Sequence, residues 1–279
     1  MNTRDTVSEP DVLASSLEIE ALERLDAVVG MAGLKAVMLA MLLHDDDPRR
    51  MRVWREETAL VQEAETIRID FEALGRSCRM PWFEEVLVRL SGSALHDRQA
   101  LLVSARKVMS ASRRLGAMDR LLWLVIRHAF GETLSRITHA VEGSGLDKLN
   151  KRERQQVERF SAHLARLVPD AAGLLANEPT DRGLQWHLAI AREINPGQPP
   201  STWYRQDVDA LVQSLAALQS LAARQRAALM DLWVGHAIRV HPQRTLSPPA
   251  SDALRLAALL LDTPMPPALA HFYIAVEDA

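Results

Sequence analysis

Four consecutive residues, His44-Asp45-Asp46-Asp47, form the densest group of potential metal ligands in the chain. Their carboxylate oxygens suit Mg²⁺ or Ca²⁺, although the ligand spacing and the glycine of an EF-hand loop are missing. The same run also suits the start of a helix, because Asp is a preferred N-cap and Pro48 fits the first helical position. The positive end of the helix dipole would then favour the neighbouring acids. Two alternatives follow, a metal site and a helix cap.

Motifs for other chemistry are missing from the sequence. The chain has no Gly-x-Ser-x-Gly segment, no Walker loop and no dinucleotide-binding glycine pattern, so we expect no cofactor. Its one cysteine, Cys78, lies between Arg76 and Arg79. The flanking charges favour a reactive thiolate, whereas burial would make the residue an inert structural thiol. A hydrolase with dispersed catalytic residues would leave no local motif, so that class stays open.

Basic side chains gather around one predicted turn, and they offer electrostatic docking instead of catalysis. Arg106 and Lys107 lie near the end of a predicted helix, and Arg113-Arg114 follow in the turn itself. Nucleic acid also requires several basic groups on one surface. The mixed signs of residues 151–154 and a pI of about 6.3 argue against nucleic acid. We therefore expect these four basic residues to contact an acidic protein.

The charge distribution along the chain supports this interpretation. Residues 1–75 contain 16 acidic and 8 basic residues, whereas residues 76–160 contain 9 acidic and 16 basic residues. The net charges of the two regions are therefore −8 and +7, although the whole chain carries only −3. Either the two regions pack together and neutralise each other, or the basic region faces an acidic partner.

Aromatic residues supply candidate apolar contacts. Trp82-Phe83 follows Pro81 at the start of a predicted helical block, where the pair either packs into the fold or anchors a partner. Trp54, Trp123 and Trp233 lie among apolar neighbours, so we expect them in the core.

The elements that must position these residues are predicted to be helices. Hydrophobic residues make up 48% of the 279-residue chain and charged residues 25%, which is typical of a globular protein. Glycine is scarce, with 12 residues, whereas Ala, Leu, Arg and Glu are plentiful. This composition favours helix over strand, and we predict an all-α array of about ten to thirteen helices.

Two similar helix-pair blocks organise the predicted array. The first covers residues 81–131 and contains Arg98-Gln99 in its first long helix, and the second covers residues 208–261 and contains Arg224-Gln225. A Gly-Ser-Gly turn and a proline-rich segment suggest boundaries near residues 143 and 200. We therefore predict an N-terminal domain over residues 1–142, connecting helices and a linker over residues 143–200, and a C-terminal domain over residues 201–279.

The segment Val28–Leu43 is the most apolar in the chain. It is shorter than the roughly 20 apolar residues that a spanning helix needs, and it contains Lys35. We therefore predict a buried helix and no transmembrane segment. The N-terminal residues lack the pattern of a secretory signal, and one cysteine cannot form an intrachain disulfide, so we expect a cytoplasmic protein.

Residues 28–132 resemble two known helical modules. The run Leu42-Leu43-His44-Asp45-Asp46-Asp47-Pro48 and the stretch from Leu95 to Leu121 are similar to the helical segment that follows the peptidase region of HtpX-like membrane metallopeptidases. More loosely, they resemble TerB-like helical domains, with the block 81–131 as the TerB-like part. The His-Glu-x-x-His peptidase motif is missing, so the resemblance implies an accessory or regulatory module and not a peptidase.

These observations give two main hypotheses. The first is a non-enzymatic helical scaffold, adaptor or regulatory subunit that binds another protein, acidic or membrane-associated, in a groove between its two halves. Its expected contacts are Arg106, Lys107, Arg113, Arg114 and the Trp82-Phe83 pair. The second is a metal-responsive, TerB-like stress module that uses His44 and the three aspartates. A homo-oligomer is compatible with either hypothesis.

Overall fold

The computed structural model describes residues 16–43, 47–112, 115–131, 145–168, 180–198 and 208–273. Within these ranges the chain forms thirteen α-helices and one short 3-10 helix, η1, and no strand, which confirms the all-α prediction. The elements are α1 (Ser16–Asp26), α2 (Gly30–Ala40), α3 (Pro48–Glu57), α4 (Ala64–Ala73), α5 (Arg76–Ser91), α6 (Leu95–Ala111), α7 (Ala117–Phe130), η1 (Leu146–Lys148), α8 (Lys151–Leu164), α9 (Asp181–Ile194), α10 (Val208–Gln219), α11 (Ala223–Val240), α12 (Pro248–Leu260) and α13 (Pro267–Ala270).

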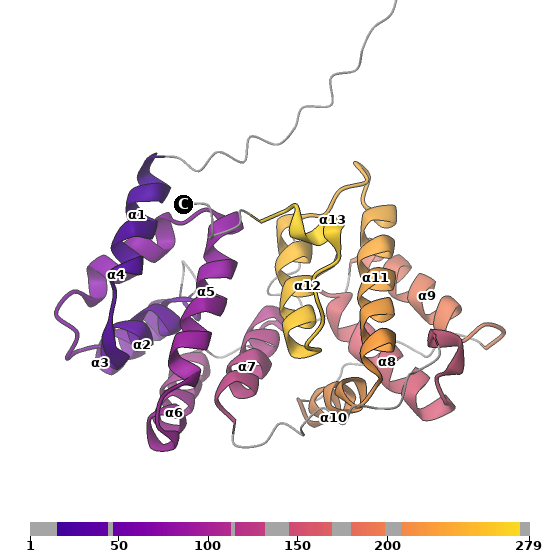
Figure 1. The fold of residues 1–279 in the computed structure, drawn as a ribbon, viewed down its shortest axis with the longest axis horizontal. Helices are drawn as coiled ribbons and strands as arrows, with labels where there is room; N and C mark the ends of the chain where they lie inside the picture. The colour runs from indigo at the N-terminus through magenta and orange to yellow at the C-terminus, as the bar shows by residue number, and fades with distance from the viewer. Residues whose placement is uncertain are drawn as a thin grey trace, which may run out of the picture.

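Helices α1 to α7 form one half of the molecule, on the left of Figure 1. Helix α2 packs against α4 and α5, α1 packs against α4, and α3 packs against α6. The apolar segment that contains α2 is thus a core helix, with Val37, Met38 and Leu39 fully buried. Among the helices of the described ranges, none has the length and apolarity needed to cross a membrane.

Local sequence signals explain where several of these helices begin. The chain turns from α1 into α2 at Gly30, whose φ of 79° is disfavoured for residues with a Cβ atom. Asp47 caps α3, because its carboxylate accepts hydrogen bonds from the backbone N–H groups of Arg49 and Arg50. Pro48 occupies the first turn of that helix. The predicted cap of α3 is therefore confirmed.

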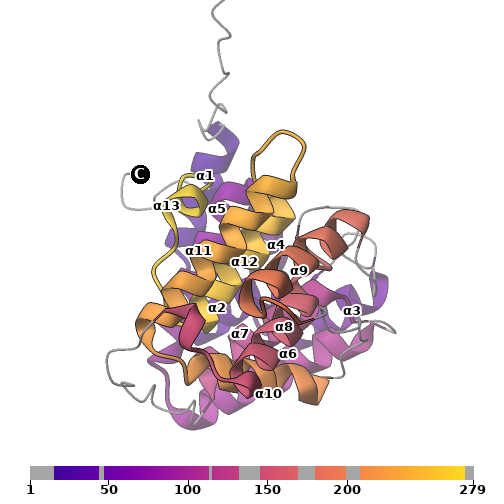
Figure 2. The same ribbon diagram turned by 90° about the vertical axis from the view of Figure 1, so that its right-hand side faces the viewer.

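The other half contains α8 to α12, which face the viewer in Figure 2. Helix α8 packs against α9 and α10, and α9 also packs against α11. Trp233 of α11 stacks on Phe160 of α8 and donates a hydrogen bond to Ser161 over 2.9 Å. The helices within the predicted connecting segment, α8 and α9, thus share a core with α10 and α11.

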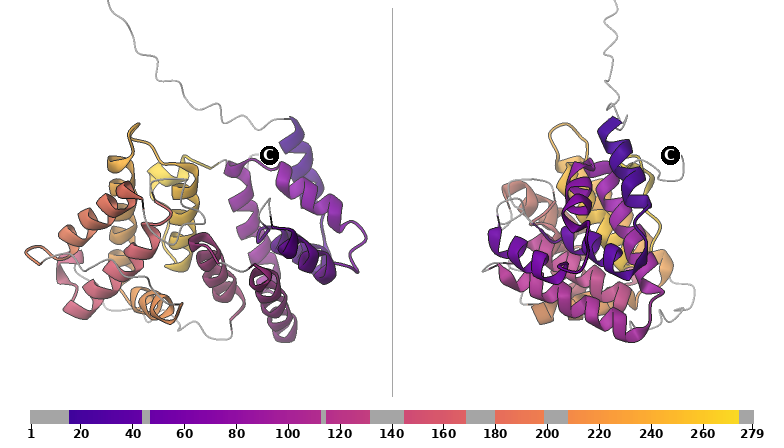
Figure 3. Two further views of the ribbon diagram at one scale, coloured as in Figure 1. Left: turned by 180° about the vertical axis from the view of Figure 1, so that it is seen from behind. Right: turned by 90° about the vertical axis from the view of Figure 1, so that its left-hand side faces the viewer.

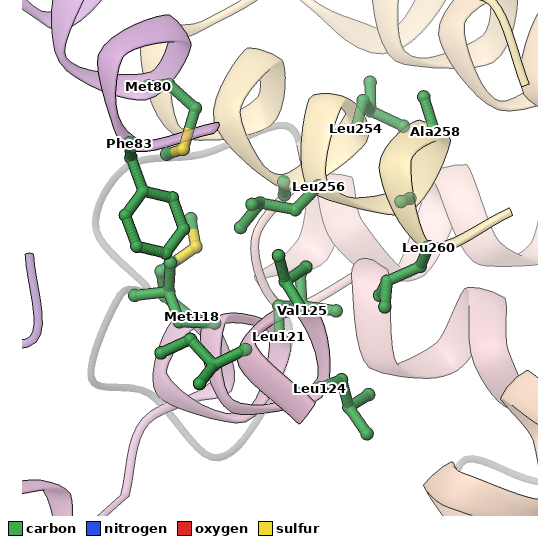
Figure 4. Packing of buried hydrophobic residues seen from close by; sticks show 14 of the residues in the cluster. Met80, Phe83, Met118, Leu121, Leu124, Val125, Leu254, Leu256, Ala258 and Leu260 are labelled. Carbon is green, nitrogen blue, oxygen red and sulfur yellow. The ribbon is translucent and has the colours of Figure 1, made fainter. Parts of the chain in front are cut away.

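The two halves meet where α7 packs against α12, between the two groups of helices seen from behind in Figure 3. Figure 4 shows Leu121 and Val125 of α7 facing Leu256 and Leu260 of α12. These four side chains are at most 1% exposed, so the junction is continuous with the hydrophobic core. An ion pair reinforces it, with Arg255 of α12 donating to the Glu84 carboxylate of α5 over 2.6 and 2.7 Å.

Both predicted blocks contain a helix pair, α6–α7 and α11–α12, and their second helices form this junction. The expected start of the first block at Pro81 is wrong. Pro81 lies inside α5, whose first turn begins at Arg76 after Gly75. Its buried position shows that the proline is part of the helix packing and not a boundary.

Candidate functional site

A groove of about 560 Å³ lies between the α6–α7 pair and α10, and so between the two halves of the molecule. Its volume falls within the range of protein sites for small ligands or short chain segments. The described residues that line it are basic, aromatic, apolar or a single serine: Arg106, Met109, Ser110, Leu115, Arg120, Trp123, Leu124, Arg127 and Leu211.

Helix periodicity places the groove residues of α7 on one face. Arg120, Trp123 and Arg127 are separated by three and four residues, the spacing that aligns side chains along a helix. Leu121 and Val125 point to the other side, where they pack against α12 (Figure 4). The junction therefore fixes the rotation of α7, and with it the direction of the groove face.

The groove is electropositive. Arg106 and Arg127 are exposed, Arg120 is half-buried, and no acidic side chain is among the described lining residues. In the part of the chain that the structure describes, neither Arg106 nor Arg127 forms an ion pair. Their charges are thus available to a ligand at the rim of the groove.

The charges of Arg120 and Arg166 also act on a buried histidine behind α7. His163 of α8 is fully buried, and its Nε2 lies 3.1 Å from the carbonyl oxygen of Ala117. Burial, together with the charges of Arg166 and Arg120, lowers the pKa of His163 to about 3. The imidazole is therefore neutral near pH 7, and Nε2 donates to the carbonyl.

The four predicted basic residues differ in where the structure places them. Arg106 lines the groove, and its docking role stays a prediction. Lys107 does not, because its Nζ donates to Glu57 of α3 over 2.7 Å, and its expected docking role has no support from this geometry. Arg113 and Arg114 lie outside the described residues, although the next residue, Leu115, lines the groove.

The second predicted surface, Trp82-Phe83, is buried. Trp82 is 1% exposed and Phe83 0%, so the packing alternative holds and an exposed anchor at these residues does not fit. Phe83 lies close to Met80 in the cluster of Figure 4. The guanidinium of Arg89 lies 4.9 Å from the centre of the Trp82 ring, which covers that side chain further.

The predicted metal ligands are only partly described. His44, Asp45 and Asp46 lie outside the described residues, and Asp47 is the α3 cap. Within the described ranges no three His, Cys, Asp or Glu side chains are grouped to hold a metal ion. The metal site therefore stays a prediction.

Of the two alternatives for the cysteine, a reactive thiolate or a buried structural thiol, the structure supports the buried thiol. Cys78 is 3% exposed in α5, and burial raises the pKa of its thiol. A raised pKa reduces the thiolate fraction at neutral pH, so the geometry supports no nucleophile at this position.

Comparisons with known proteins leave the groove as the main guide to function. No protein-family model, no curated protein and no solved structure matches the chain. The resemblance to HtpX-like and TerB-like helical segments accordingly stays a prediction.

Sequence reasoning missed most of the groove. It assigned Trp123 to the core, whereas the structure leaves this side chain half-buried in the groove wall. The spacing of Arg120, Trp123 and Arg127 on a predicted helix was a usable signal. No sequence signal pointed to Leu211 as a groove residue, because α10 is far from α7 in the sequence.

Proposed function

We propose that this protein is a non-enzymatic helical scaffold that binds an acidic segment of another protein in the groove between α6, α7 and α10. The observation that carries the proposal is the lining of that groove, which combines exposed Arg106 and Arg127 with Trp123 and an apolar floor. A cytoplasmic location fits a chain with a single cysteine.

The two parts of the lining support different aspects of binding. Exposed arginines attract an acidic segment at long range and raise the rate of encounter. The floor of Met109, Leu115 and Leu124 can bury an apolar side chain of the partner, and a half-buried Trp is a frequent hot-spot residue. An acidic segment that carries at least one apolar residue matches both parts.

Affinity capture from the native cell tests the proposal. We expect the double variant Arg106→Glu and Arg127→Glu to reduce capture of the partner by about tenfold or more, because each reversal replaces attraction with repulsion. High salt should weaken capture by the wild-type protein, since exposed charges are screened. Mass spectrometry of the captured proteins provides the measurement.

The control variant reverses two exposed arginines elsewhere, Arg192 of α9 and Arg224 of α11. It has the same net charge as the groove variant and should capture the partner as well as the wild type does. Equal loss in both variants would indicate a general effect of net charge, and unchanged capture by the groove variant would contradict the proposal.

A further inference from the structure

One loop of this chain has the chemistry that the groove would recognise. Residues 56–65, Glu-Glu-Thr-Ala-Leu-Val-Gln-Glu-Ala-Glu, connect α3 to α4 and contain four acidic residues and no basic one. Leu60, in the middle, is 99% exposed, the highest exposure among the large hydrophobic residues of the described chain. We call this segment the acidic loop.

The acidic loop is held in a defined shape. The backbone N–H of Val61 donates to the Thr58 carbonyl over 2.9 Å, and that of Ala64 donates to the Val61 carbonyl over 3.1 Å. At the base of the loop, Glu57 accepts hydrogen bonds from Ser104 and Lys107 of α6. Leu60 is therefore presented on an ordered loop, so little conformational entropy is lost when it binds.

We infer that the acidic loop of a second copy of this chain binds in the groove. Leu60 would enter the apolar floor beside Trp123, and the exposed Glu63 would lie near Arg106 and Arg127 at the rim. The inference rests on the groove of the proposed function and names a second copy as an occupant of it. Glu56, Glu57 and Glu65 form ion pairs with basic side chains of their own chain, whereas Glu63 forms none within the described residues. The charge that matches the groove arginines is therefore that of Glu63, which lies three residues from the exposed apolar side chain of Leu60.

The contact must form between copies. None of residues 56–65 is among the described residues that line the groove of its own chain. The hydrogen bond from Lys107 to Glu57 holds the base of the loop against α6, on the side of α6 that faces α3. Two different patches then meet, so the interface is heterologous. A single loop buries little area, and we expect association in roughly the micromolar to millimolar range.

Sedimentation velocity over about 10 µM to 1 mM protein tests the inference. The wild-type sedimentation coefficient should rise with concentration, whereas Leu60→Asp and the double variant Arg106→Glu and Arg127→Glu should stay monomeric. Leu60→Asp should still fold, because its side chain is solvent-exposed. The control Leu17→Asp changes another exposed leucine, 68% exposed on α1, and should associate like the wild type.

Mixing the two defective variants gives the decisive result. Leu60→Asp retains its groove, and the arginine variant retains its acidic loop, so an equimolar mixture should form a one-to-one dimer. A wild-type protein that stays monomeric, a Leu60→Asp variant that associates normally, or a monomeric mixture would each overturn the inference.

The outcomes also separate this inference from the proposed function. Leu60→Asp should capture an acidic partner protein as well as the wild type does, because its groove is intact. If the groove variant loses that partner while the wild type is monomeric, only self-association is overturned. If self-association occurs as described and no other protein depends on the groove, the binding of a separate partner is overturned instead.

Discussion

At the scale of single residues, the Glu57 carboxylate is held by three donors from two other helices. It accepts hydrogen bonds from Lys107, Ser104 and Lys35, which come from α6 and α2. Burial alone would raise the pKa of Glu57, but these three donors outweigh it and lower that pKa to about 2. The ionised form of Glu57 therefore stabilises the folded protein.

The sign of this effect predicts a pH profile. The folded-state pKa lies below the ordinary value of 4.5, so the stabilisation is complete above pH 4.5 and is lost as the pH falls toward 2. Glu57→Gln should lower the free energy of unfolding by at most about 3 kcal/mol at pH 7. The difference from the wild type should shrink below pH 4.5, as measured by urea unfolding at several pH values.

A neighbouring residue provides the control for that series. Glu56 is next in the chain, and its side chain is 67% exposed. Glu56→Gln should follow the wild-type profile at every pH, because exposed ion pairs contribute little. A Glu57→Gln deficit that stays constant from pH 7 to pH 3 would contradict the role assigned to the Glu57 charge.

At the scale of elements, one buried ion pair joins α3 to α7. Arg50 is 0% exposed, and its guanidinium donates to both carboxylate oxygens of Asp119 over 2.7 and 2.9 Å. Asp119 also accepts a hydrogen bond from the backbone N–H of Gly116 at the start of α7. The same carboxylate thus caps α7 and holds it against α3.

Removing that carboxylate charge should destabilise the protein strongly. Asp119→Asn removes the close counter-ion of the buried Arg50 and leaves only Asp47, whose Oδ2 lies 3.8 Å from Nε of Arg50. A cost of about 3–5 kcal/mol is typical when one partner of a buried ion pair is removed. Urea unfolding at pH 7 measures it. Asp231→Asn, on the exposed side of α11, should change stability by less than about 0.5 kcal/mol. Equal, small effects of the two substitutions would refute this account.

The sequence predicted the elements better than their contacts. Asp47-Pro48 marked the start of α3 because capping depends on local backbone groups, and the apolar run around Val37 marked a core helix. The Arg50–Asp119 pair was not predicted, since its members are 69 residues apart and each resembles an ordinary surface charge in the sequence. Pro81 was misread as a boundary because tertiary packing accommodates it inside α5.

At the scale of the whole molecule, the α7–α12 junction positions the groove. Burying one face of α7 against α12 turns Arg120, Trp123 and Arg127 toward α10 of the other half. The basic region was visible in the sequence, and one of its candidate residues, Arg106, lines the groove. The groove itself required the fold, because Leu211 and Arg106 approach only after the two halves pack together.

The central claim is that an acidic protein segment occupies this groove, and site-specific crosslinking tests it most directly. Ser110 lines the groove and is exposed, so Ser110→Cys can carry a thiol-linked photocrosslinker while the buried Cys78 stays unlabelled. Ala223→Cys, at the exposed start of α11, is the control position. We expect irradiation to link an acidic segment at position 110 and not at position 223. No link at position 110, or links to segments without acidic residues, would contradict the claim.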